Sequence, residues 1–180
     1  MTIQDMTAQE CRAMLAGMRV ARLACARDNQ PYIVPVHVDL DEEFLYGYAT
    51  LGQKIEWMRV NPLVCLEIDD LTSHGTWASV VVFGHYEELP HTPEYEGPRR
   101  VAERLFQRHP SWWEPASVPL GAHPQRPPVV FRICIDRVTG RVAGPKREAG
   151  APPQWAPSPR KPDDRGWLAQ RLRAVFTRHP

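Results

Sequence analysis

Apolar and polar residues alternate over most of the first 140 positions, and this two-residue period is typical of β-strands. Three such stretches, residues 20–26, 32–40 and 44–49, are separated by short polar turns at 28–30 and 41–42. Strands joined by turns of this length pair antiparallel. The pattern therefore predicts an antiparallel meander near the N-terminus.

Three further apolar runs, residues 63–68, 76–88 and 129–142, bring the expected number of strands to six. The run 76–88 places Trp77, Ser79, Val81 and Phe83 on one face and Ala78, Val80, Val82 and Gly84 on the other. A strand that is apolar on both faces is usually covered on both sides. We therefore expect this strand to belong to a barrel whose outer face is covered by a partner molecule.

Helical patterns are few and peripheral. Residues 7–10 read Thr-Ala-Gln-Glu, a capping box that predicts a helix ending near Gly17. A second short helix is expected over 54–60, because the residue before Pro62 disfavours helical geometry. A third is expected to begin between Pro93 and Arg99 and to end at Gln107, followed by a proline-rich loop over 109–128.

The pattern changes after residue 144. We expect one β-rich domain over 1–144, a proline-rich linker or arm over 145–163, and a basic amphipathic helix over 164–180. Residues 141–180 hold nine Lys and Arg against three Asp and Glu, a net charge of +6, whereas residues 1–140 hold 13 against 18, a net charge of −5. This complementarity favours packing of the helix on the acidic body or on a dimer mate over nucleic-acid or membrane binding.

Composition excludes several classes of protein. No apolar run approaches the roughly 18 residues of a membrane span, and the first residues lack a signal-peptide pattern, so a cytoplasmic location is expected. The four cysteines contain no C-x-x-C pair and are interpreted as reduced thiols. The seven histidines show no H-x-x-x-H spacing, so no metal site is expected.

Candidate chemistry lies where the third strand ends. Tyr48-Ala49-Thr50 is followed by a glycine and then by Gln53-Lys54 at an expected helix start. A hydroxyl, the free amides of a helix N-terminus and a lysine together form a typical anion site. The residues alone leave open whether Lys54 binds an anion or is a solvated surface lysine.

Three segments carry a family resemblance: ARLACARDNQPYIVPVHVDLDEEFLYGYATLGQKIEWMRVNPLVCLEI, TWASVVVFGHYEEL and CIDRVTGRVAG. In this order they resemble the FMN-binding split barrels of the pyridoxamine 5'-phosphate oxidase-like superfamily, and the last is similar to the closing strand of its nitroimidazole-resistance branch. The resemblance covers about residues 7–145. It implies a mostly β protein with peripheral helices, a six-stranded antiparallel split β-barrel, and a homodimer with FMN at its interface.

The resemblance also implies roles for individual residues. Thr50, Gln53 and Lys54 would hold the flavin phosphate, next to Tyr48 and Ala49. The edge of the isoalloxazine ring would lie along the backbone of Ile33, Val34, Pro35 and Val36. Trp77 and Ser79 would approach the ring or the ribityl chain, from the same or the second subunit, and for Trp77 an ordinary core position is equally open.

The activity implied is that of a nitroreductase-like flavoenzyme, which moves electrons from NAD(P)H through FMN to a small aromatic or nitro acceptor. No catalytic residue follows from the sequence, although Tyr48 or His37 could donate a proton. Tyr48 stands where many members of the branch have histidine, and the chain end differs from that of the vitamin B6 enzymes, whose substrate is not expected. The alternatives are a deazaflavin reductase, or a non-catalytic flavin or haem module that uses His37, His74 or His85.

Overall fold

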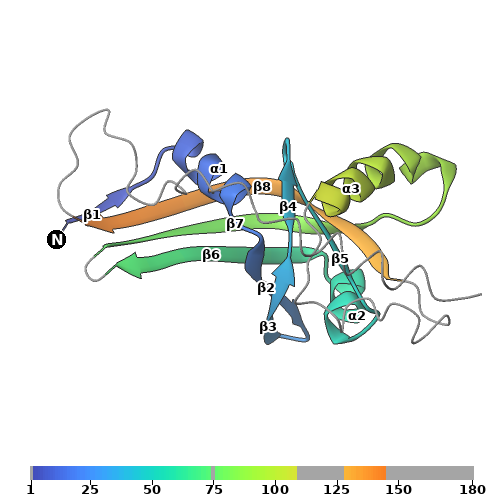
Figure 1. The fold of residues 1–180 in the computed structure, drawn as a ribbon. Helices are drawn as coiled ribbons and strands as arrows, with labels where there is room; N and C mark the ends of the chain where they lie inside the picture. Colours follow the sequence, from blue (N-terminus) through green and yellow to red (C-terminus); the bar gives the residue numbers. More distant parts are fainter. Residues whose placement is uncertain (1, 74–75, 109–127, 145–180) are drawn as a thin grey trace, which may run out of the picture.

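The computed structural model of the protein describes residues 2–73, 76–108 and 128–144 (Figure 1). These residues form one antiparallel sheet of eight strands with three α-helices and one 3-10 helix around it. Along the sheet the strand order is β3-β2-β6-β7-β8-β5-β4, and β1 pairs with β8 beside this path. The expected class, mostly β with peripheral helices, is confirmed.

The meander forms as the sequence predicts. β2 (Val20–Arg27) and β3 (Gln30–His37) are joined by Asp28 and Asn29, which both have positive φ, 52° and 62°. Two positive φ values define the type I′ turn, whose twist matches that of a hairpin, and Asp and Asn tolerate this geometry. β4 (Asp39–Asp41) and β5 (Phe44–Ala49) follow.

Three long strands make the centre of the sheet: β6 (Leu63–Ser73), β7 (Thr76–Glu88) and β8 (Val129–Gly144). β7 pairs with β6 on one edge and with β8 on the other. The free edge of β8 pairs first with β5 and, further along, with β1 (Thr2–Asp5). β8 therefore connects the two ends of the molecule (Figure 1).

The sheet curls into a split barrel. β3 and β5 have no strand pairing with each other in the described residues, yet they meet where His37 lies against Gly47. A Cβ atom at Gly47 would lie 3.0 Å from the carbonyl oxygen of His37 and 2.7 Å from Cζ of Phe131. Glycine at this position therefore lets the two ends of the sheet approach each other.

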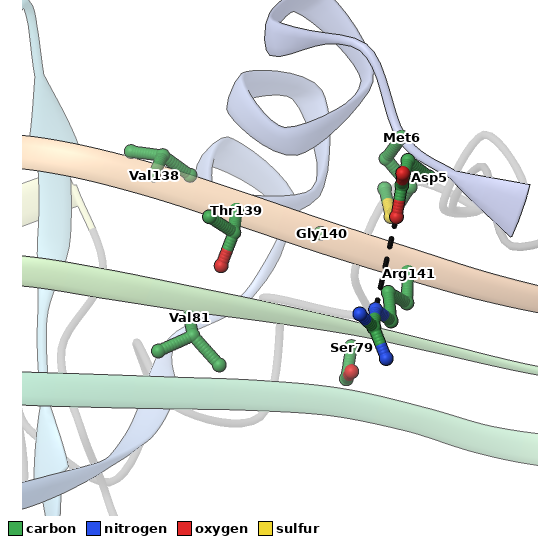
Figure 2. A pocket seen from close by; sticks show the side chains of 8 residues that line it. All are labelled: Asp5, Met6, Ser79, Val81, Val138, Thr139, Gly140 and Arg141. Atoms are coloured by element: carbon green, nitrogen blue, oxygen red, sulfur yellow. Dashed lines mark ion pairs between the residues drawn. The ribbon is translucent and has the colours of Figure 1, made fainter.

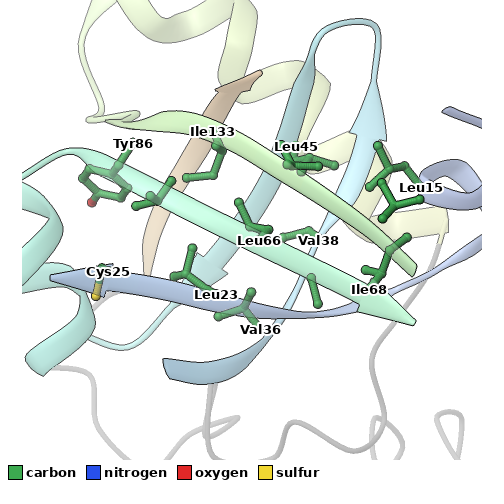
Figure 3. Close-up of a cluster of buried hydrophobic side chains, with 14 of the residues drawn as sticks. Leu15, Leu23, Cys25, Val36, Val38, Leu45, Leu66, Ile68, Tyr86 and Ile133 are labelled. Atoms are coloured by element: carbon green, nitrogen blue, oxygen red, sulfur yellow. The ribbon is translucent and has the colours of Figure 1, made fainter. Parts of the chain in front are cut away.

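The core fills the inside of this barrel (Figure 3). Leu23, Leu66, Val80 and Ile133 come from four different strands and are fully buried. The capping-box helix α1 (Ala8–Gly17) adds Cys11, Met14 and Leu15, and α2 (Gln53–Val60) adds Ile55 and Met58. A smaller cluster packs α3 (Glu96–Arg108), which follows the 3-10 helix η1 (Pro93–Tyr95), on Tyr46 and Leu89.

The structure corrects the expected number of strands. The sheet has eight strands in the described residues instead of six, because β1 adds to β8 and the stretch 32–40 divides at Val38 into β3 and β4. The outer face of β7 is partly exposed in the single chain, where Phe83 is 37% exposed, so its expected coverage by a partner molecule stays a prediction. The expected loop from residue 109, the arm over 145–163 and the helix over 164–180 lie outside the described residues. Within the described residues no helix is long and apolar enough to cross a membrane.

Candidate functional site

The end of β5 and the start of α2 form an open cluster of hydrogen-bond donors. β5 ends at the buried Ala49, and α2 begins at Gln53 without a side-chain cap. The first amides of a helix have no partner inside the helix, and they carry the positive end of its dipole. A Cβ atom at Gly52 would meet nothing within 4 Å, so the helix start is accessible. Lys54 lies half-buried in the first turn, and Thr50 precedes it.

The open edge of β3 is the second part of the site. In a type I′ turn Arg27 and Gln30 are hydrogen-bonded, so every second residue from Gln30 onward points its backbone groups at β2. The amide of Val38, which donates to the carbonyl of Arg19 at 3.0 Å, continues this alternation. The intervening residues, Pro31, Ile33, Pro35 and His37, therefore direct their backbone groups to the other edge.

This alternation decides which amides a ligand can reach. Proline has no N–H, so between residues 31 and 36 the open edge offers the amide of Ile33 together with carbonyl oxygens. The amides of Val34 and Val36 point into the ladder with β2. The side chain of Ile33 is 61% exposed, in keeping with an accessible edge.

Tyr48 and His37 differ in accessibility. The His37 side chain is 1% exposed, and its ring centroid lies 6.4 Å from that of Tyr48. Tyr48 is half-buried and makes an edge-on contact with Phe106 of α3, at 4.8 Å between ring centroids. Of the two proton donors that the sequence suggests, Tyr48 is therefore the one nearer the surface.

Behind His37 lies an ion pair that the sequence analysis missed. Arg19 donates to the buried carboxylate of Asp39 at 2.5 Å, and Nε2 of His37 lies 3.9 Å from the same carboxylate. A buried charge is costly unless it is paired, so this pair ties the start of β2 to the start of β4. The sequence signal was an aspartate inside an otherwise apolar run, at the point where β3 ends.

Trp77 and Ser79 are not brought to this cluster within one chain. Ala49 lies opposite Val129 on β8, whereas Ser79 lies opposite Arg141 on the same strand. Twelve residues separate these two levels, which is about 40 Å measured along the strand at its usual rise per residue. The phosphate-site residues therefore lie at the opposite end of β8 from Trp77 and Ser79. Pro35 of β3 lies at the level of Val81, on the far side of β2 and β6 from β7.

The described residues give little support to thiol, metal or haem chemistry. All four cysteines are free, and burial raises the pKa of each thiol, so none is an activated thiolate. No cluster of three metal-ligating side chains occurs in the described part of the chain. Of the histidines suggested as haem ligands, His37 is buried, His85 contacts Asp136 at 3.1 Å, and His74 lies outside the described residues.

The sequence model of the pyridoxamine 5'-phosphate oxidase family matches residues 7–142, three quarters of the chain. The protein belongs to this family. Its split-barrel fold is the one that the resemblance implied.

Individual proteins are similar to this chain over most of its length. Protein RA0666 of Rhizobium meliloti is 41% identical over 146 residues, which cover 79% of this chain and 97% of the relative. The crystal structure of a FAD-binding protein from Mesorhizobium loti is 40% identical with a TM-score of 0.67, covering 80% and 98% of the two chains. A candidate 5-nitroimidazole antibiotic resistance protein from Bacteroides thetaiotaomicron, 18% identical with a TM-score of 0.57 over 79% and 90% of the chains, shares the fold.

Proposed function

We propose that the protein is an oxidoreductase that binds FMN at a homodimer interface and passes electrons from NAD(P)H to a small, nitro-aromatic type of acceptor. The observation that carries this proposal is the open donor cluster at the start of α2, beside the open edge of β3, in a member of a flavin-binding family. Bound flavin supplies the two-electron chemistry. The protein's own residues would bind the flavin, orient the acceptor and supply its protons.

The phosphate would bind at the start of α2. The ammonium group of Lys54 supplies charge, and the first amides of the helix and the Thr50 hydroxyl supply donors in a fixed arrangement. Gln53 is exposed at the first helical position and can add its side-chain amide. Charge-assisted hydrogen bonds of this kind are about twice as strong as neutral ones, so they would dominate the affinity.

The ring would lie along β3. The amide of Ile33 is the backbone donor that the open edge presents to a ring nitrogen or oxygen, whereas Pro35 presents a carbonyl. A donor at this position stabilises the added electron density of a reduced ring and so raises its reduction potential. Tyr48, at the adjoining end of β5, can hold a proton for the acceptor, with His37 packed behind it.

The second subunit would complete the site. In the proposed dimer Trp77 and Ser79 would approach the ring from the partner chain, because within one chain β2 and β6 lie between β3 and β7. The outer face of β7, on which both lie, remains partly exposed and includes Val81 and Phe83. Exposed apolar faces of this kind are typical of interfaces.

The identity of the flavin has a second candidate. The Mesorhizobium loti relative is named a FAD-binding protein. FAD contains the whole of FMN, so the phosphate cluster and the edge of β3 would serve both, and a deazaflavin phosphate could use the same cluster. Haem has less support, because His37 is enclosed and His85 is engaged with Asp136.

Flavin retention after desalting tests the proposal. Wild-type protein incubated with FMN should keep the flavin absorption bands, and Lys54→Ala should weaken binding about 10- to 100-fold, because one charge-assisted contact is lost. Arg100→Ala removes an equal charge from an exposed position on α3 and should bind FMN like the wild type. The flavin proposal fails if the wild type retains neither FMN nor FAD.

A further inference from the structure

A hollow of about 570 Å³ lies over the ladder between β7 and β8 (Figure 2), at the end of β8 opposite to the one that pairs with Ala49. Ser79 lies directly opposite Arg141 across this ladder, and Val81 lies opposite Thr139, so these four side chains share one face. Asp5 of β1 and the adjoining Met6 close the hollow along the other edge of β8. The volume is in the range of small-molecule sites.

The side chains of the hollow are arranged by charge. Nε of Arg141 lies 3.7 Å from a carboxylate oxygen of Asp5, and both side chains are mostly exposed, at 68% and 90%. Both side chains therefore remain accessible to a ligand. The Ser79 hydroxyl lies beside Arg141, Thr139 lies further along β8 opposite Val81, and Val81 and Met6 supply apolar surface.

This set of groups fits the parts of a nucleotide. Arginine binds phosphate through two parallel hydrogen bonds, and neighbouring hydroxyls donate to the remaining oxygens. A carboxylate accepts hydrogen bonds from ribose hydroxyls, as in dinucleotide-binding folds. A free phosphate would meet repulsion from Asp5, whereas a ribose phosphate would use both charges.

We propose that this hollow binds a nucleoside monophosphate group, with Arg141, Ser79 and Thr139 at the phosphate and Asp5 at the ribose. The source of the group rests on the proposed function: because Ser79 would lie next to the partner's flavin, the group is the adenylate half either of FAD or of the nicotinamide donor. The site itself is defined by the residues of the hollow and does not depend on the flavin.

Direct titration with adenosine monophosphate tests the site. Calorimetry should show saturable binding to the full chain, weakened about tenfold or more in Arg141→Gln, because the bidentate contact is lost. Arg100→Gln is the control, since it removes an equal charge from an exposed position on α3 outside the hollow. Wild type should prefer the ribonucleotide over its 2′-deoxy analogue severalfold, and Asp5→Asn should lose that preference.

Flavin binding and the KM for NAD(P)H distinguish the two sources of the nucleotide group. If the group belongs to the flavin, Arg141→Gln weakens FAD about tenfold and leaves FMN unchanged. If it belongs to the donor, the variant binds FMN and FAD like the wild type and raises the KM for NAD(P)H. Wild-type protein that fails to bind adenosine monophosphate at millimolar concentration, or equal binding by Arg141→Gln with unchanged circular dichroism, overturns the proposal. Nucleotide binding without FMN binding would remove the flavin proposal and keep this site.

Discussion

The two faces of β7 carry similar residues and have different surroundings. On the inner face Ala78, Val80 and Val82 are 0% exposed, because β2, β6 and the helices fill the barrel around them. On the outer face Val81 is half-buried and Phe83 is 37% exposed. An apolar face of a strand can be covered by its own chain or by another chain. The alternation of residues in the sequence does not distinguish these two cases.

The largest expected effect comes from charging the inner face. Val80→Asp places a carboxylate in the barrel core without a partner and should destabilise the fold by about 4 kcal/mol or more. Val81→Asp changes the next residue, which points outward, and should keep the monomer folded. Urea unfolding followed by fluorescence measures both. Equal loss of stability in the two variants would show that the faces do not differ in a single chain.

The next effect concerns the bulge that lets β7 follow β8. The register shifts between Phe83 and Gly84, and a Cβ atom at Gly84 would collide with the carbonyl oxygen of Cys134. Gly84→Ala should therefore cost about 2 kcal/mol. Gly97→Ala on α3 is the control, because its Cβ meets nothing within 4 Å and should stabilise the helix by about 0.5–1 kcal/mol. Thermal unfolding with opposite shifts in Tm would confirm both.

A smaller change in stability, with a change in assembly, is expected at Phe83. Phe83→Asp puts a charge on the proposed interface and should convert the dimer to a monomer, while the monomer stays within about 1 kcal/mol of the wild type. Gln107→Asp adds the same charge on an exposed part of α3 and should leave the dimer intact. Light scattering after size exclusion measures the mass. A wild-type monomer would contradict the proposed interface.

The smallest effect is at the end of β7, where its inner face becomes polar. Arg59 binds Glu88 with two hydrogen bonds of 2.8 Å, which lower the pKa of this carboxyl below its ordinary 4.5. A lowered pKa gives stability that is present above the ordinary value and is lost as pH falls through the folded one. Arg59→Gln should cost up to about 1 kcal/mol at pH 7, and this cost should shrink as the pH falls below 4.5 and Glu88 becomes protonated in the folded protein. A cost that is independent of pH would contradict this origin.

Local chemistry explains which elements the sequence predicts well. The Asp28–Asn29 turn, the capping box at Thr7 and the Pro62 stop each act within a few residues, and each element begins or ends where expected. The division at Val38 was missed, because β3 turns away from the ladder where Arg19 and Asp39 pair. That ion pair joins residues 20 positions apart, and no local pattern reports it.

In the candidate site, too, local arrangements are predictable from the sequence and long-range ones are not. Thr50, Gln53 and Lys54 are neighbours in sequence, so the strand-to-helix pattern alone predicts that they lie together. Which backbone amides of β3 face the open edge depends on whether odd or even residues hydrogen-bond to β2. The register of the hairpin decides this. The distance between Ser79 and Ala49 depends on the pairing of both with one long strand, which the sequence does not reveal.

The placement of the two residue groups at opposite ends of β8 has a consequence for mixed assemblies. Each site of the proposed dimer would combine Thr50, Gln53 and Lys54 of one chain with Trp77 and Ser79 of the other. Chains defective at Lys54 and chains defective at Trp77 are then each inactive alone. In a heterodimer of the two, however, one site carries both defects and the other carries none, so complementation between subunits restores half of the flavin sites of that heterodimer. With random assembly half of the dimers are heterodimers, so co-expression should restore about a quarter of all flavin sites.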